Sequence, residues 1–327
     1  MQAIKNTLSA LKLGEPAAHG RLAVFPLTGA DAPGPDYLTL DEAVAAGVLR
    51  VTEVSLGGSV PELNVANSGS RPVLLLDGEQ LVGAKQNRIL NLSILVPAKA
   101  EITIPVSCVE AGRWDWRSET FAGSKSPAFA GLRAAKAAQV SASLAQRGAR
   151  RADQRAVWDA VSKKMGRMNV ASPTGAMNDV FERFDQEMHG FEAALPPTAD
   201  QRGAIFAIGG RVAGLDLFDR AATFARVRDK LVRSYALDAI EGGEKDQPAE
   251  AGAAQRFLDA LQIATVAHYP ATGLGEDVRL DGLGLCGAAL VVEDKLVHLC
   301  AFARPAGPHQ AADAPMASWA RRRHGLH

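Results

Sequence analysis

Lys and Arg together number 36, and so do Asp and Glu, so the 327-residue chain has no net charge that would draw it to nucleic acid or to an anionic membrane. Hydrophobic residues make up 47% of the chain, which is enough for a sizeable core. The three cysteines, Cys108, Cys286 and Cys300, are far apart and odd in number, which argues against a disulfide framework and against a zinc ribbon.

The first part of the chain predicts one strand and one short helix. We expect residues 1–19 to be mobile and residues 22–27, an apolar run, to form the first strand. Thr39 and Glu42 then have the spacing of a capping box, in which each side chain binds the backbone of the other residue. This pattern predicts a helix that starts after Thr39 and ends at Gly47.

Apolar and polar residues alternate with a period of two over residues 49–110, which is typical of strands. The apolar runs predict strands over 49–56, 63–65, 73–76, 89–96 and 102–109. Asp77-Gly78 is a turn signal, so we expect the segments on either side of it to pair as a hairpin. Short strands at this spacing indicate an antiparallel meander or sandwich rather than βαβ units.

The middle of the chain is helical by the same test, and strands return near its end. Apolar residues three and four apart predict helices around 157–165, 177–195, 224–235 and 257–261. A hairpin is expected over 204–218, bending at Gly209-Gly210, and strands over 278–280, 288–292 and 296–302. The polar segment 241–254 has the composition and length of a disordered loop.

Together these elements predict an α+β fold with a mostly antiparallel β-sandwich or meander core. The helices are inserted between the N-terminal and C-terminal strands, which we expect to share sheets. The predicted organisation is a mobile N-terminus over residues 1–19, one domain over 20–304 and a disordered tail over 305–327, rich in Ala, Pro and Gly. Two domains divided near residue 145 are the alternative.

The sequence contains none of the short motifs that would identify a cofactor or metal site. There is no GxxxxGK[ST] phosphate loop, no HExxH and no GxSxG, so we predict no metal site and leave the cofactor unassigned. Lys5 and Lys12 interrupt the apolar residues of the chain start, and no long apolar run follows. We therefore expect a cytoplasmic protein with no membrane partner.

The first polar cluster, in the stretch LLLDGEQLVGAKQNR, contains Glu79, Gln86, Asn87 and Arg88. The planar guanidinium of Arg88 suits a phosphate or a carboxylate, and the amides of Gln86 and Asn87 can read a base or a sugar. Glu79 is a candidate general base. The alternative is structural, since charged and amide side chains also protect strand edges and satisfy the backbone of bulges.

The second polar cluster follows a predicted strand in SCVEAGRWDWR, residues 107–117. Glu110 is a candidate catalytic carboxylate, Arg113 a phosphate ligand and Trp114 a surface on which a base stacks. The alternative is a structural corner, in which Glu110 and Arg113 pair and Trp114 is buried. A nucleophilic role for Cys108 is less favoured, because the sequence places no particular base beside the thiol.

The third candidate is His298, which lies within an alternating strand. We include it among the catalytic candidates because histidine titrates near neutral pH. The alternative is a histidine with satisfied hydrogen bonds in the core or on the surface.

Several of these segments together resemble the bacterial family of the ARG and rhodanese-phosphatase-superfamily-associated protein domain, where ARG means ADP-ribosylglycohydrolase. The stretches that carry the resemblance are RPVLLLDGEQLVGAKQNRILNLSILVPA, IPVSCVEAGRW, QRAVWDAVSKK, SPTGAMNDV, IGGRVAGLDLFD, KLVRSYALDAI and GAALVVEDKLVHLCAF. The resemblance implies one continuous unit and a role linked to NAD or ADP-ribose metabolism. It implies no catalytic residue.

The sequence therefore supports two hypotheses about function. In the first, the protein binds a small phosphorylated or nucleotide-like ligand and in one version also hydrolyses it, so whether it is an enzyme stays undecided. In the second, it is a non-enzymatic scaffold or interaction domain. Nucleic-acid binding through Arg321 and its neighbours is the least favoured interpretation, and a homo-oligomer stays open.

Overall fold

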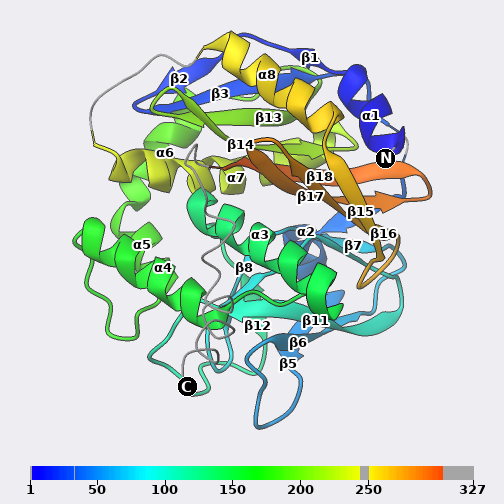
Figure 1. The fold of residues 1–327 in the computed structure, drawn as a ribbon. Helices are drawn as coiled ribbons and strands as arrows, with labels where there is room; N and C mark the ends of the chain where they lie inside the picture. The colour runs from blue at the N-terminus through cyan, green and yellow to red at the C-terminus, as the bar shows by residue number, and fades with distance from the viewer. Residues whose placement is uncertain (1, 33, 244–249, 305–327) are drawn as a thin grey trace, which may run out of the picture.

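The computed structural model describes residues 2–32, 34–243 and 250–304, and it confirms the predicted α+β class (Figure 1). The predicted tail over 305–327 lies outside the described residues, as does part of the predicted loop over 241–254. The helices within residues 130–194 fall between the strands of the N-terminal and the C-terminal parts, as the sequence pattern predicts.

The largest sheet has nine strands, all paired in the antiparallel sense, and it joins strands from both ends of the chain. Its order is β1 (Lys12–Leu13), β3 (Leu22–Thr28), β13 (Gln201–Ile208), β14 (Arg211–Phe218), β18 (Lys295–Ala303), β17 (Leu285–Val292), β16 (Glu276–Gly282) and β15 (Thr265–Pro270), and β2 (Ala17–His19) pairs with β3. The predicted hairpin bend is formed by β13 and β14, where Gly209 and Gly210 both have positive φ.

Helices cover both faces of this sheet (Figure 1). On one face lie α1 (Gln2–Ser9) and α8 (Ala251–Gln262); on the other lie α3 (Ala130–Arg147) and α7 (Ala221–Glu241), with α4 (Gln154–Arg167), α5 (Met177–Arg183) and α6 (Asp185–Ala194) completing that core. The two cores therefore place most of the helical apolar stripes against the sheet, as their periodicity indicates.

The chain start departs from the expected mobile segment. Residues 2–19 form α1, β1 and β2, and Ile4 and Leu8 are buried beneath the large sheet. These two side chains lie four residues apart, so they share one face of the helix and bury together. Burial of these two side chains holds the chain start against the large sheet.

Two smaller sheets form the other half of the molecule around a third core. The first has the order β12 (Phe121–Gly123), β8 (Gln80–Gly83), β9 (Arg88–Leu90), β11 (Ala100–Cys108), β6 (Glu62–Asn67) and β5 (Leu49–Glu53). The second has the order β10 (Ile94–Val96), β7 (Val73–Leu75) and β4 (Leu38–Thr39), with β4 and β7 parallel. The capping box is confirmed: Thr39 and Glu42 cap α2 (Leu40–Ala45) reciprocally.

The predicted hairpin across Asp77-Gly78 is wrong. Strand β7 pairs with β10, whereas β8 pairs with β9 and β12, so the turn passes the chain from one small sheet to the other. The Glu79 carboxylate accepts from the Leu76 backbone N–H at 2.8 Å, and the Gly78 N–H donates to the Leu90 carbonyl at 3.0 Å. These contacts fix a tight turn at Asp77-Gly78, but the strands on either side of the turn do not pair with each other.

Candidate functional site

Pairing between β9 and β11 brings the two main polar clusters of the sequence together. Arg88 lies opposite Cys108 in the register of these strands, so the Gln-Asn-Arg segment and the segment that leads to Glu110 are neighbours. The resulting group of buried side chains, here named the Arg88 cluster, contains Glu53, Gln86, Asn87, Arg88, Cys108, Glu110 and Arg113. It therefore unites five residues that the sequence analysis selected for binding or catalysis.

Glu110 is fully buried and its carboxylate is saturated with hydrogen bonds. It accepts from Arg113 Nε at 2.9 Å and Nη2 at 2.6 Å, from the Asn87 backbone N–H at 3.0 Å and from the Thr174 hydroxyl at 2.8 Å. Burial raises the pKa of Glu110, but the donors from Arg113, Thr174 and Asn87 outweigh it and hold this pKa below its usual value. Glu110 is therefore a charged anchor between β11, the segment before β9 and the start of α5.

Gln86 links the backbone near Glu110 to the side chains of the cluster. Its Nε2 donates to the Glu110 carbonyl at 2.8 Å, while its Oε1 accepts from Arg88 Nη1 at 3.2 Å and from the Cys108 thiol at 2.7 Å. The Cys108 sulfur also lies 3.5 Å from Arg88 Nη1. Burial raises the pKa of the Cys108 thiol although Arg88 acts to lower it, so the resting group is a thiol.

Several buried polar atoms around Arg88 have no hydrogen-bond partner among the described residues. They are Arg88 Nε and Nη2 and Glu53 Oε2. The nearest carboxylate oxygen to Arg88 Nη2 is Glu53 Oε1, at 3.7 Å, which is an ion pair without a hydrogen bond. Burial lowers the pKa of Arg88, against the opposite influence of Cys108 and Glu53.

Two half-exposed indoles form the outer side of the cluster. Trp114 and Trp116 are 40% and 47% exposed, and the Arg88 guanidinium lies 5.5 Å from the centre of the Trp114 ring. Lys85 Nζ lies 5.4 Å from the Trp114 ring and 5.2 Å from the Trp116 ring. The Trp114 ring therefore lies close to both cations, the Arg88 guanidinium and the Lys85 ammonium, and Trp116 lies close to Lys85.

Glu79 does not belong to this cluster. Its carboxylate pairs with Lys230 of α7 at 2.8 Å, and Lys230 also pairs with Asp41 at the start of α2. Glu79 therefore ties its turn to the helical layer and lies apart from Arg88. The sequence could not supply this partner because Lys230 is 151 residues away.

His298 lies in a third place, within a group named here the Asp216 cluster: Asp77, Arg133, Lys136, Asp216 and His298. Its Nδ1 is 2.7 Å from the Ser93 hydroxyl and its Nε2 is 3.4 Å from Asp216 Oδ1. Arg133 binds Asp216 with two hydrogen bonds, of 3.0 and 2.6 Å. The predicted catalytic residues thus lie in three separate networks, and their catalytic roles stay predictions.

A comparison with protein families matches residues 10–302 to the ARG and Rhodanese-Phosphatase-superfamily-associated Protein domain. The chain belongs to this family. Its extent takes in the Arg88 cluster, both small sheets and the strands of the large sheet as far as β18. No curated protein and no solved structure matches the chain significantly.

Two residues of this region, Glu53 beside Arg88 and Trp158 near Cys108, were not among the predicted site residues. Glu53 is the last residue of β5 and alternates with buried Leu49 and Val51, so its position on the inward face was a readable signal of a buried carboxylate. Trp158 lies on α4 within an apolar stripe and looked like ordinary core. Only the packing of α4 against β11 places its indole N–H near Cys108.

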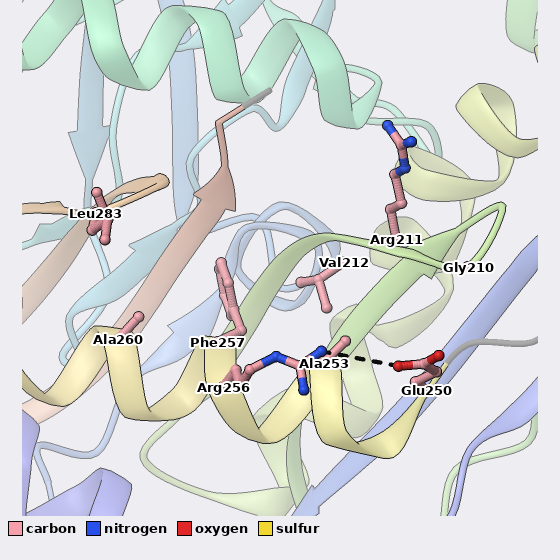
Figure 2. A pocket seen from close by; sticks show the side chains of 9 residues that line it. All are labelled: Gly210, Arg211, Val212, Glu250, Ala253, Arg256, Phe257, Ala260 and Leu283. Atoms are coloured by element: carbon pink, nitrogen blue, oxygen red, sulfur yellow. Dashed lines mark ion pairs between the residues drawn. The ribbon is translucent and has the colours of Figure 1, made fainter. Parts of the chain in front are cut away.

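A hollow of about 560 Å³ lies away from these clusters, beside α8 and the β13–β14 turn (Figure 2). Arg256 and Glu250 form an ion pair of 4.0 Å at one side, and Leu283, at another side, is 96% exposed. None of the predicted site residues lines this hollow. Within the described residues there is no group of three or more His, Cys, Asp or Glu side chains suited to a metal ion, and no helix has the length and apolar character to cross a bilayer.

Proposed function

We propose that this protein binds a small phosphorylated, nucleotide-like ligand at the Arg88 cluster. The observation that carries the proposal is the set of buried polar atoms without hydrogen-bond partners: Arg88 Nε and Nη2 and Glu53 Oε2. Each such atom costs about 1–3 kcal/mol when it is left unsatisfied, so several in one place are expensive unless a ligand meets them. Their gathering beside half-exposed indoles supports a binding site.

The unpartnered atoms fit the parts of a nucleotide. A guanidinium edge formed by Nε and one Nη donates two parallel hydrogen bonds to a phosphate. Glu53 Oε2 can accept from a ribose hydroxyl. Trp114, with its exposed face, offers a stacking surface for the base.

The family supports this choice of ligand. The name of the family associates it with ARG, and the resemblance noted in the sequence implies NAD or ADP-ribose linked metabolism. ADP-ribose carries phosphates, ribose hydroxyls and a purine, which are the groups that Arg88, Glu53 and Trp114 would hold. In this proposal Glu110 and Arg113 position the site rather than contact the ligand, because their polar atoms are engaged with one another and with the backbone.

Titration calorimetry tests the proposal with ADP-ribose, AMP, ribose 5-phosphate and inorganic phosphate. We expect binding of at least the nucleotide probes, and loss of about tenfold or more in affinity in Arg88→Gln, since charge-assisted hydrogen bonds are among the stronger polar contacts. Arg71→Gln is the matched control, because Arg71 is half-exposed and pairs only with Asp36 among the contacts of the described residues.

A second variant guards against misfolding of Arg88→Gln. Trp114 is half-exposed, so Trp114→Ala should keep the fold and still weaken nucleotide binding. Heat signals for none of the probes, or affinities unchanged in both Arg88→Gln and Trp114→Ala, would refute the ligand site and favour the scaffold hypothesis.

A further inference from the structure

We infer that the loop of residues 54–60 is a lid that controls access to the Arg88 cluster, an inference that rests on the proposed ligand site. Arg88 has no exposed surface and Glu53 Oε2 is buried, so a ligand reaches their unpartnered atoms only after part of the chain moves. The loop joins β5 to β6 and starts directly after Glu53. Opening of this lid admits a small nucleotide from solvent.

Gly58 is the point at which the lid touches the cluster. A methyl group placed on its Cα would lie 3.1 Å from Trp114 Cζ2 and 3.3 Å from Glu53 Oε2. The same methyl group would lie 3.1 Å from Lys85 Cδ, and Gly58 has a φ of +75°, which L side chains rarely adopt. The backbone of the lid therefore lies against the carboxylate oxygen that has no hydrogen-bond partner.

The lid is weakly held in this closed position. Its tether to the cluster is a hydrogen bond of 3.3 Å from Lys85 Nζ to the Gly57 carbonyl, and the Gly58 N–H donates within the loop, to Ser55. None of the residues 54–60 is buried, and Leu56 is 88% exposed. A segment that buries so little apolar surface opens at a low cost in free energy.

The second loop on the outer side of the cluster, residues 112–117, is held firmly. The backbone N–H groups of Gly112 and Arg117 both donate to carbonyls outside the loop, at 2.7 and 3.0 Å. Between them, Arg113 binds the Glu110 carboxylate through two hydrogen bonds, of 2.9 and 2.6 Å. The lid therefore opens against a fixed rim that carries Trp114.

Lys85 couples the lid to the charge of the ligand. Its Nζ donates to the Gly57 carbonyl and lies between 5 and 6 Å from the centres of the Trp114 and Trp116 rings. A phosphate oxygen is a stronger partner for an ammonium group than a neutral carbonyl is. An arriving phosphate therefore competes with Gly57 for Lys85 and releases the tether.

Amide hydrogen exchange at single-residue resolution tests the lid on the full chain without ligand. The Lys85 backbone N–H reports opening, because it donates to Glu53 Oε1, at 3.3 Å, beside the atoms that Gly58 covers. The Asn87 backbone N–H, which donates to Glu110 Oε2 at 3.0 Å on the side of the fixed rim, is the internal reference.

Gly58→Ala should favour the open lid, because the added methyl group crowds Trp114 and the φ of +75° strains an alanine. We expect exchange at Lys85 to become about tenfold faster and exchange at Asn87 to stay unchanged. Gly284→Ala is the matched control, since Gly284 has the same φ but no atom within 4 Å of an added methyl group. Exchange at Lys85 that is equal in both variants overturns the lid.

Stopped-flow fluorescence with AMP then tests whether the lid controls ligand entry. Binding through a lid gives an observed rate that levels off, as AMP concentration rises, at the rate of opening. We expect Gly58→Ala to raise this plateau about tenfold, and Lys85→Met, which removes the tether without strain at Gly58, to raise it about fivefold. A rate that rises linearly with AMP and is the same in all three proteins overturns the lid alone, whereas no binding of AMP overturns the ligand site as well.

Discussion

Replacing Glu110 by Ala tests whether this carboxylate is the anchor of the Arg88 cluster. In the folded protein it receives hydrogen bonds from Arg113, Thr174 and the Asn87 backbone. The substitution leaves the Arg113 guanidinium without its carboxylate in a buried site. Removing one partner of a buried ion pair costs about 3–5 kcal/mol, because the remaining charge is uncompensated.

Urea denaturation at pH 7, followed by circular dichroism, measures this loss. With a slope of about 3 kcal/mol per molar urea, a loss of 3–5 kcal/mol lowers the midpoint by about 1–1.7 M. Glu119→Ala is the matched control, because Glu119 lies on the same loop with its side chain exposed. We expect the control to unfold like the wild type.

The contribution of Glu110 also depends on pH in a defined direction. Its pKa in the folded protein lies below the usual value, so the stability it provides is present above about pH 4.3, the unfolded value, and is lost as the pH falls toward the folded pKa. The difference between wild type and Glu110→Ala should therefore shrink below about pH 4. Equal midpoints for Glu110→Ala and Glu119→Ala at pH 7 would refute the anchoring role.

Three further variants probe the rest of the fold and the site. Arg133→Ala leaves Asp77 and Asp216 as buried carboxylates without their shared cation, so we expect thermal denaturation to show a loss of about 3–5 kcal/mol, and a loss below 1 kcal/mol would contradict the pairing. Trp114→Ala should lower the free energy of unfolding, measured by urea denaturation, by about 1 kcal/mol or less, because the ring is 40% exposed. A larger loss would mean that the indole supports the core. Thr39→Ala removes the confirmed capping box and should cost about 1 kcal/mol in the same assay, whereas an unchanged midpoint would show that α2 does not depend on its cap.

The sequence predicted the elements that local patterns specify. The capping box of Thr39 and the bend at Gly209-Gly210 depend on residues a few positions apart, and both are confirmed. The proximity of the Gln-Asn-Arg segment to Glu110 was also predictable, because the two lie at the ends of strands that are neighbours in an antiparallel sheet. The family resemblance then indicated the same stretches.

Partners that lie far apart in the sequence were not predictable. Glu79 meets Lys230, and His298 meets Ser93 at a separation of 205 residues, so no periodicity in either strand could identify these contacts. The predicted pairing of β7 with β8 was wrong for a related reason. A turn signal specifies where the chain turns but not which sheet receives the next strand, and β7 pairs with β10 instead.

Arg88 and Arg113 differ in their hydrogen bonds rather than in charge or burial. Both are buried arginines of one cluster, and no pattern in the sequence favours either as the phosphate ligand. Arg113 donates to Glu110 and to the carbonyls of Ala84 and Asp115, so its guanidinium holds the loop together. Arg88 donates only through Nη1 among its contacts in the described residues and keeps two buried nitrogens without acceptors. Since a buried donor without an acceptor destabilises the free protein, a ligand that supplies oxygen atoms gains most by binding at Arg88.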